Sequence, residues 1–448
     1  MLWQIIKKEY LLNLISLRFV IAFVLASGLT ILSVYMLIDD YQARLNEYGK
    51  RVTSHAEQLR GALNYTDLID DEIIVDKEPA RLSVLAQGIE RNINPVVKFR
   101  KGEYPVLSES ASENPLFSLF KRIDFLFVVQ YILSLMALFF AYDNISGEKE
   151  TGTLKLMFSN SIPRDKVLLG KVIGGFGSLI TPLAFSFLVG LILIVLRGVG
   201  FSTEDYLRAG AIFLASVLFL FCLYVLGIMV STATKSSVTS LFVLLFIWTL
   251  LVFTIPPLSH LGAKHIYKAP EYSSVLSNMV SIRQEAQKRF MERSFEYGLD
   301  HGAAPSLDMI YKFFREEKEK GDQKIKRVLE HHESELRSQI QGATLLSRLS
   351  PVAAFSNGVM RLANTGLDDQ YNFIESVRRY QLNLFGYVEG VEKKENPVNS
   401  ASLPRYAYKR VSMEGSIAGA AVDLGVLALF TACFFAVAYY LFLKYDLR

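Results

Sequence analysis

Six long apolar runs divide this chain, and they constrain its fold more than any other feature. Each is close to or above the roughly eighteen to twenty residues that an α-helix needs to cross a bilayer. Buried helices of a soluble protein would instead alternate apolar and polar faces. The sequence therefore predicts an α-helical polytopic membrane protein. Its six transmembrane helices are expected at 19–38, 122–143, 168–196, 207–231, 238–256 and 417–443.

The composition agrees with a membrane protein that carries soluble portions. Hydrophobic residues make up 51% of the 448 residues, and the net charge is +4. A nucleic-acid-binding protein would show a concentrated basic face, and none appears, so nucleic acid is not an expected partner. Cys222 and Cys433 both fall in apolar runs. We expect them to be small apolar fillers rather than a disulfide.

Two segments near the N-terminus lie outside the apolar runs. Residues 1–18 place apolar side chains at spacings of three and four, which predicts an amphipathic helix in the membrane interface. Residues 39–121 first continue the helical pattern of the first span and then carry turn signals. We expect a small external α+β domain there, with short strands at 72–76, 96–100 and 104–107.

The largest segment outside the spans is 257–415. Apolar side chains recur there at helical spacing in several stripes, separated by the densely charged tract 315–327. This pattern predicts a large, mainly helical external domain, with a helical hairpin or rod that stands off the membrane.

The distribution of Lys and Arg predicts the orientation of the spans. Six spans place both termini on one side, together with the loop 144–167, and that side carries most of the basic residues of the short loops. The positive-inside rule therefore places both termini and this loop in the cytoplasm. Asp423 is nearly the only ionisable residue noticed inside the spans, which argues against a proton-coupled or ion-coupled pump.

The loop 144–167 is charged and interrupted by glycine. It reads Ser146-Gly147-Glu148-Lys149-Glu150-Thr151-Gly152-Thr153-Leu154, followed by Ile162-Pro163-Arg164 and then Leu168-Leu169-Gly170-Lys171. Glycine costs helix stability, so Gly147 and Gly152 are expected to break the helix that arrives from the membrane. A structured, solvated loop between two membrane helices suits the docking of a partner that moves them.

This motif resembles the intracellular loop of ABC-2 type export permeases. That family has an acidic/basic pair, a Gly-Thr-Leu, a Pro-Ser-Arg-like turn and a Gly-Lys that opens the third membrane helix; here Ile162-Pro163-Arg164 departs slightly from the turn. The region 349–381 resembles a permease subgroup that includes gliding-motility exporters and the exporter for copper-site maturation of nitrous oxide reductase. The resemblance implies a bacterial plasma (inner) membrane location and an interfacial helix at 1–18 beside the ATPase.

The resemblance also implies the function and the partners. The chain would be the permease subunit of an exporter, and a separate cytoplasmic ABC ATPase subunit would bind ATP and Mg and hydrolyse ATP. No Gly-x-x-x-x-Gly-Lys-Ser/Thr loop occurs in this chain, so no catalytic residue, cofactor or metal is assigned to it. Six spans are half of such a transporter, so a second permease copy, identical or related, is expected, with membrane lipid around it and room for an external partner. The expected ATPase contacts are Glu148, Lys149, Glu150, Thr151, Gly152, Thr153, Leu154, Arg164 and Lys166.

Two other functions stay open. In the first, ATP-driven motion passes to the external helices and nothing crosses the membrane. The second is a membrane metalloprotease, suggested by His331-His332-Glu333-x-Glu335, in which His331 and Glu335 are four residues apart on a helix. No third ligand is evident, and the arrangement is not His-Glu-x-x-His. We interpret Gly174-Gly175-Phe176-Gly177 as a helix-packing surface rather than a nucleotide loop, because no strand precedes it.

Overall fold

The computed structural model describes residues 2–61, 72–101, 103–107, 123–159, 163–301, 305–392 and 403–445. Within these residues, six helices are long and apolar enough to cross a membrane: Leu17–Gln58, Phe125–Glu150, Arg164–Leu196, Thr203–Ala233, Ser237–Ile266 and Met413–Leu443. Parts of the expected α+β domain (62–71 and 108–121) and positions 160–162 of the loop lie outside the described residues. The predicted α-helical polytopic fold is confirmed.

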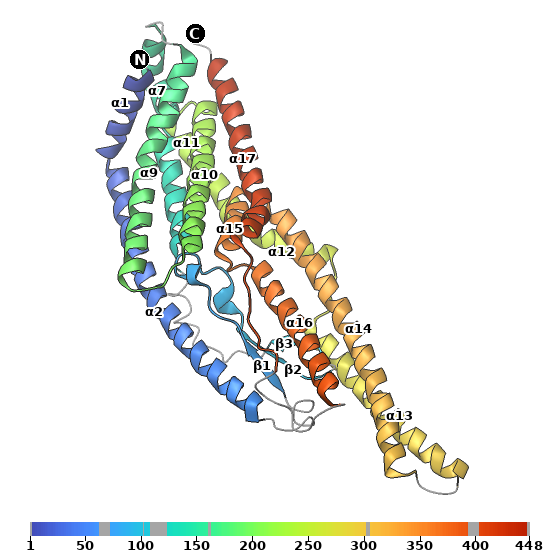
Figure 1. Cartoon of the computed structure of the whole chain (residues 1–448). Coiled ribbons are helices and arrows are strands. Elements are labelled where there is room, and N and C mark those ends of the chain that lie inside the picture. Colours follow the sequence, from blue (N-terminus) through green and yellow to red (C-terminus); the bar gives the residue numbers. More distant parts are fainter. Residues whose placement is uncertain are drawn as a thin grey trace.

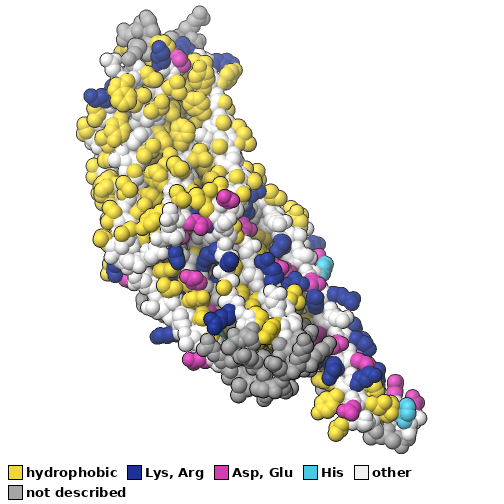
Figure 2. Space-filling view, in the orientation of Figure 1, with side chains coloured by type: hydrophobic (Ala, Val, Ile, Leu, Met, Phe, Trp, Pro, Cys, Tyr) yellow, Lys and Arg dark blue, Asp and Glu magenta, His cyan; other side chains and the backbone are white. Residues whose placement is uncertain are grey.

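The six helices form one bundle. It contains α1 (Leu2–Leu14), α2 (Leu17–Gly61), α5 (Phe125–Phe127), η3 (Val128–Leu133), α6 (Ser134–Ala141), α9 (Arg164–Leu196), α10 (Thr203–Ala233), α11 (Ser237–Thr249), η4 (Leu250–Thr254), α12 (Ile255–Ile266) and α17 (Met413–Leu443). The start of α1 and the end of α17 lie at the same end of this bundle (Figure 1). Apolar side chains dominate its visible surface, whereas charged side chains gather on the rest of the molecule (Figure 2). This distribution is typical of a bundle that faces lipid.

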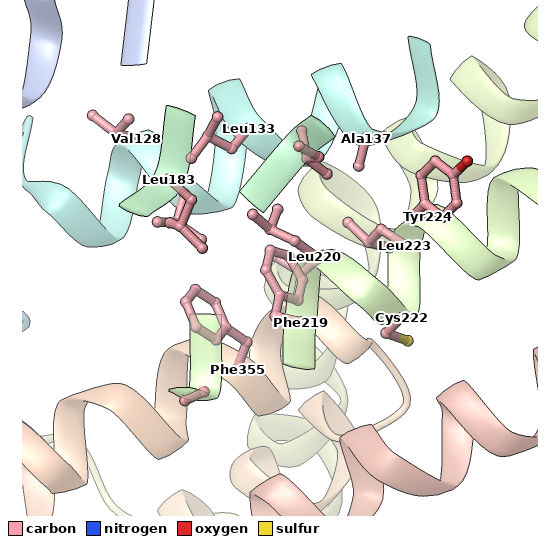
Figure 3. Close-up of a cluster of buried hydrophobic side chains, with 14 of the residues drawn as sticks. Val128, Leu133, Ala137, Leu183, Phe219, Leu220, Cys222, Leu223, Tyr224 and Phe355 are labelled. Carbon is pink, nitrogen blue, oxygen red and sulfur yellow. The ribbon is translucent and has the colours of Figure 1, made fainter. Parts of the chain in front are cut away.

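Helix α10 lies at the centre of the bundle core. Phe219, Leu220 and Tyr224 of α10 are fully buried. The Phe219 ring stacks on Phe355 with 4.3 Å between ring centroids and an interplanar angle of 5° (Figure 3). Phe355 belongs to α15 (Pro351–Ala363), which begins with a proline after the capping residue Ser350. The sequence placed this segment in the external domain, but its apolar residues pack into the bundle core.

Two membrane helices contain a π-helical turn, and the two turns contact each other. The turn η3 interrupts the second span and η4 the fifth. The ring of Tyr131 in η3 lies 5.8 Å from the ring of Phe253 in η4. Trp248 Nε1 also donates to Ser134 Oγ at 3.0 Å. Wide π turns of this kind are frequent at functional sites.

The external part has one core made from both external segments. Strands β1 (Ile73–Asp76), β2 (Val96–Phe99) and β3 (Val106–Leu107) form an antiparallel sheet in the order β1-β2-β3, in agreement with the expected strands. Val97 and Phe99 pack against Phe373 and Val377 of α16 (Leu367–Glu392). The two external segments were expected as separate domains, but they share this core because α16 covers one face of the sheet.

A long helical hairpin completes the external part. It consists of α13 (Tyr272–His301) and α14 (Leu307–Ser347), which extend away from the bundle (Figure 1). The expected hairpin therefore appears in the structure, with its tip residues 302–304 outside the described ranges.

Helix α2 links the two parts of the molecule. It runs without interruption through 45 residues. Near its start, Arg18 Nη2 lies 2.7 Å from Asp143 Oδ2, just after α6. Near its other end, Arg51 Nε donates to Asp76 Oδ1 of β1 at 2.8 Å. The same helix is therefore fixed both to the bundle and to the external sheet.

Candidate functional site

The loop after the second span folds into two short helices. These are α7 (Ser146–Glu150) and α8 (Thr153–Ser159). Gly152 joins them with φ of +74°, a left-handed conformation that glycine adopts without steric cost. The expected helix break at Gly152 is therefore present, whereas the break expected at Gly147 is wrong, because Gly147 lies inside α7. The hydroxyls of Thr151 and Thr153 lie 3.0 Å apart, and both residues are exposed at the turn.

Glu148 holds α7 to a buried lysine. Lys171 Nζ lies 2.8 Å from Glu148 Oε1 and 3.1 Å from Glu9 Oε1 of α1, and it donates to Asn144 Oδ1 at 3.2 Å. Lys171 is only 2% exposed. A buried ammonium group is costly unless it is paired and hydrogen-bonded, so these contacts fix α1, α7 and α9 relative to one another.

Lys149 and Glu150 connect α7 to the turn between α10 and α11. Lys149 Nζ donates to the carbonyl oxygens of Thr232 and Thr234, the latter at 3.1 Å. Glu150 Oε2 accepts a hydrogen bond from the backbone N–H of Ser237 at 3.1 Å. A carboxylate at a helix N-terminus also interacts favourably with the helix dipole. The two charges therefore bind opposite sides of one tight turn.

The second half of the loop contacts the last span. Arg164, the first residue of α9, donates through Nη1 to the carbonyl oxygens of Leu443 at 2.6 Å and Tyr445 at 3.1 Å. These carbonyls lie at the end of α17, where the last turn of a helix leaves acceptors unsatisfied. Lys166 is exposed.

The expected partner contacts divide into three groups. Leu154 is fully buried in the bundle core and anchors α8 from inside. The side chains of Glu148, Lys149 and Arg164 bind other elements of this chain, as does the exposed Glu150. The remaining expected contacts are Thr151, Gly152 and Thr153 at the turn and the exposed Lys166, and the exposed Lys155 and Leu156 of α8 lie beside the turn.

Several residues of this site were not recognised in the sequence. They are Glu9, Arg18, Asp143, Asn144 and Ser231, which hold the loop or the end of the second span, whereas Lys171 was expected only as part of the Gly-Lys motif, without a partner. Ser231 Oγ accepts from the backbone N–H groups of Ile145 at 3.1 Å and Ser146 at 3.0 Å. A usable signal existed only for Lys171, because a lysine inside an apolar run needs a partner.

The prediction that the spans contain almost no charge beyond Asp423 is wrong. Lys171 and Arg208 both lie in predicted spans, and Arg208 is only 4% exposed. Arg208 Nη2 pairs with Glu204 at 2.8 Å, and its Nη1 donates to the Leu362 carbonyl at 3.0 Å. Asp423 is fully buried and lies between two arginines. Each of these charges lies near the end of a span and is neutralised by a partner, which is four residues away for Arg208 and distant in the sequence for Lys171 and Asp423.

The glycine cluster in α9 packs against α1, as expected. A Cβ atom on Gly174 would lie 2.7 Å from the Ile6 carbonyl oxygen, and one on Gly170 would lie 2.6 Å from Ile5 Cγ2. At these two positions, only the hydrogen atom of a glycine fits between the helices, and a larger side chain would clash with α1. The Gly174–Gly177 region therefore serves close helix packing.

The histidine cluster of α14 does not assemble a metal site. His331 Nε2 lies 3.5 Å from Glu335 Oε1, and the His331 side chain is largely exposed. No group of three or more His, Cys, Asp or Glu side chains within the described ranges is placed to hold a metal ion.

Six apolar helices and the loop tied to them define a multi-pass membrane protein. A family model described as ABC-2 family transporter protein matches residues 3–447. The chain therefore belongs to the ABC-2 transporter family, as a permease subunit of an ABC transporter, which confirms the resemblance of the loop motif. None of the curated proteins compared with the chain matches it. The resemblance to the gliding-motility subgroup stays a prediction.

Proposed function

We propose that this permease couples ATP hydrolysis by a separate cytoplasmic ABC ATPase to export of a substrate. The ATPase docks on the exposed turn Thr151–Thr153 and on Lys166, and it supplies the bound ATP and Mg. The observation that carries this proposal is the set of polar contacts behind the turn. Glu148, Glu150 and Arg164 connect it to α9, α11 and α17 respectively.

These contacts support a mechanical role for the loop. When the ATPases close, a docked loop moves with them, and its ion pairs and hydrogen bonds carry the displacement into the helices they bind. Such coupling requires that the partner contacts the two states of the permease differently. The role needs no catalytic residue in this chain.

The proposed assembly has two permease copies, identical or related, and two ATPases, in the bacterial inner membrane with both termini in the cytoplasm. The basic residues of the short loops support this orientation. The loop α7–α8 lies at the end of the bundle that carries both chain ends (Figure 1).

The test separates docking from transmission. The tagged chain is purified in mild detergent with the ATPase that accompanies it. Thr151→Asp together with Thr153→Asp adds charge to the exposed turn and is expected to reduce ATPase co-purification. Glu148→Gln removes the charge that pairs with Lys171, so it should leave co-purification intact and lower permease-stimulated ATP hydrolysis.

Thr53→Asp is the matched control, because Thr53 is exposed on α2 far from the loop. It should change neither property. Full ATPase recovery and full stimulation in the Thr151/Thr153 double variant would contradict docking at this turn.

A second candidate function is transmission of motion without transport. It is favoured by the α13–α14 hairpin, which stands away from the bundle and exposes Phe295, Leu299 and Tyr311. Sealed inverted vesicles that contain the whole complex distinguish the two functions. ATP-dependent accumulation of a substrate inside them supports export, whereas ATP-dependent change in hairpin accessibility without accumulation supports transmission.

A further inference from the structure

A large cavity lies where the outer end of the bundle meets the external part. Its volume is about 1110 Å³. Charged and amide side chains from α2, from the segment between β1 and β2, and from α16 line one side. Leu126, Phe127 and Tyr131 from the start of the second span, with Met360 of α15, give the other side most of its apolar surface, and that side also includes the polar side chains of Asp124, Gln130 and Ser356. The cavity is therefore amphipathic, with its apolar wall on the membrane helices.

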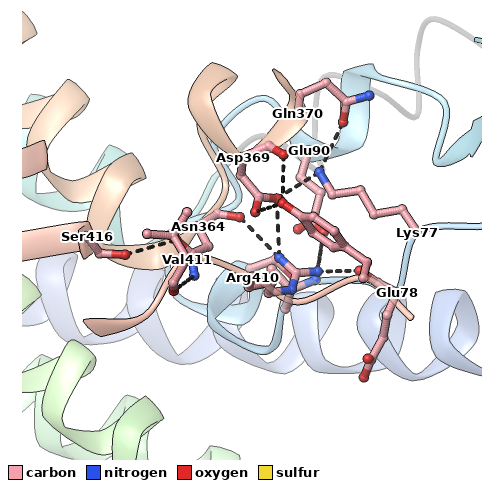
Figure 4. Close-up of polar contacts among 12 residues, drawn as sticks. Lys77, Glu78, Glu90, Asn364, Asp369, Gln370, Arg410, Val411 and Ser416 are labelled. Carbon is pink, nitrogen blue, oxygen red and sulfur yellow. Dashed lines mark hydrogen bonds and ion pairs between the residues drawn. The ribbon is translucent and has the colours of Figure 1, made fainter. Parts of the chain in front are cut away.

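Two amide groups of the polar wall have hydrogen-bond donors without partners. Nε2 of Gln87 and Nε2 of Gln370 are buried and make no hydrogen bond within the described structure. The two residues are only 5% and 7% exposed. Gln370 Oε1 accepts from Lys77 Nζ at 3.0 Å (Figure 4). Because an ammonium group can only donate, the oxygen of Gln370 must face Lys77, which leaves its NH₂ group for another acceptor.

One acceptor of the same wall also lacks a hydrogen bond. Glu90 Oε2 makes none within the described structure, although the carboxylate lies between two arginines, with Arg44 Nη1 3.9 Å from Oε2 and Arg410 Nη2 3.6 Å from Oε1. The other oxygen, Oε1, accepts from the backbone N–H of Ala80 at 2.6 Å. Buried polar groups are nearly always hydrogen-bonded, so a donor and an acceptor left open in one cavity indicate a ligand or water.

The charges of the wall exclude a strongly anionic ligand. Its cations are paired with carboxylates of this chain: Arg44 and Arg91 lie 3.0 Å and 3.1 Å from Asp40, Arg51 lies 2.8 Å from Asp76, and Lys77 lies 2.8 Å from Asp369. The open groups are instead two neutral donors and one carboxylate oxygen. They match a head group that offers both acceptor oxygens and a cationic N–H donor.

We propose that this cavity binds the head group of a zwitterionic amphiphile of the phosphatidylethanolamine type. Its phosphate oxygens accept hydrogen bonds from Gln87 and Gln370, its ammonium group faces Glu90, and its acyl chains follow Phe127, Tyr131 and Met360. The π turn η3 presents Tyr131 and Gln130 to this wall. The inference deepens the proposed export function, on which it rests for placing the cavity at the outer membrane surface.

The test measures lipid binding to the full chain alone. Isothermal titration uses the purified protein in mild detergent, with dihexanoyl phosphatidylethanolamine and dihexanoyl phosphatidylglycerol as probes. The ethanolamine lipid is expected to bind at one site, about tenfold more tightly than the glycerol lipid. Gln87→Leu removes an open donor at similar volume and should weaken binding about tenfold. Gln323→Leu, on the exposed surface of α14, should leave the affinity unchanged.

Gln370→Glu is the second variant in case Gln87→Leu does not fold. It keeps a partner for Lys77 and turns a carboxylate oxygen toward the phosphate, so it should also weaken binding. Equal affinity for both lipids, no saturable binding, or wild-type affinity in these variants would overturn the proposal. No ATPase is present, so this test can fail while loop coupling holds.

Discussion

The ammonium group of Lys171 lies 2.8 Å from the carboxylate of Glu148, across 23 positions of sequence, and is 2% exposed. The same ammonium binds Glu9 of the first helix at 3.1 Å. One buried charge therefore joins the loop, the N-terminal helix and the third span. This junction leads to the first prediction.

Lys171→Met is expected to lower the free energy of unfolding by about 2–4 kcal/mol, because it leaves two carboxylates beside an apolar side chain. The Glu9 and Glu148 side chains are 14% and 21% exposed, so solvent screens part of the cost. Unfolding in mixed detergent micelles measures the change. Lys155→Met, at an exposed site of α8, is the control and should unfold like the wild type. Identical curves for the two variants would refute the structural role of the pair.

Gly174→Ala is expected to separate α1 from α9. The new methyl group would lie 2.7 Å from the Ile6 carbonyl oxygen, a backbone atom that cannot move alone, and overpacking of this kind costs about 1–3 kcal/mol. In a Cys433→Ser background, a cysteine introduced by Ile6→Cys should react faster with a thiol reagent in the variant.

Gly210→Ala is the matched control for this prediction. Nothing lies within 4 Å of a Cβ atom at that position of α10. Alanine there should stabilise the helix by about 1 kcal/mol and leave the labelling of position 6 unchanged. Equal labelling rates in both variants would show that α1 does not depend on the glycine.

Asp423→Leu is expected to loosen the contact between α17 and the segment α14–α15. Asp423 Oδ1 lies 2.6 Å from Arg348 Nε, and its Oδ2 lies 3.5 Å from Arg361 Nη1. Removing one partner of a buried charge cluster costs about 3–5 kcal/mol. Arg361 still pairs with Asp368 at 2.8 Å in this variant, so Arg348 is the arginine that is mainly left without a carboxylate partner. Thermal unfolding measures the effect. The control Asp300→Leu, at an exposed site of α13, should unfold at the same temperature as the wild type.

The external core is expected to weaken in alkali. Burial raises the pKa of Tyr380 to about 12 and also raises the pKa of Tyr406 and Tyr408. An unfolded tyrosine ionises near pH 10, so its folded counterpart keeps the proton longer. The resulting stability is present below about pH 10 and is lost as the pH rises toward 12.

Tyr380→Phe should reduce this alkaline loss, because the variant keeps the ring and removes one ionisation. It also removes the hydrogen bond that Tyr380 donates to the Pro404 carbonyl at 3.0 Å, so it should be slightly less stable at neutral pH. Unfolding at a series of pH values measures both effects. Tyr311→Phe, at an exposed site, should keep the wild-type pH dependence. A steeper loss in Tyr380→Phe would contradict the assignment.

The sequence could predict whatever depends on neighbouring positions. The lengths of the apolar runs located the spans, turn signals located strands such as Ile73–Asp76, and glycine located the break at Gly152. These signals reflect local backbone preferences and periodicity. The motif of the loop was recognisable for the same reason.

Contacts between distant positions could not be predicted in this way. Glu9 and Lys171 are 162 residues apart, and nothing in the sequence around either residue identifies the other as its partner. The burial of α15 in the membrane bundle could not be predicted either, because a 13-residue apolar helix is equally compatible with the core of an external domain. The sheet and α16 likewise carry ordinary amphipathic patterns, and only tertiary packing brings them together.

The unbroken course of α2 has a mechanical consequence. At 1.5 Å per residue, its 45 residues span about 67 Å. Arg18 and Arg51, which bind the bundle and strand β1, are 33 residues and therefore about 50 Å apart, so a tilt of about 5° displaces the β1 contact by about 4 Å. Under the proposed coupling, a small tilt of α2 at the loop end of the bundle would therefore move the sheet at the other end of the molecule by several ångströms.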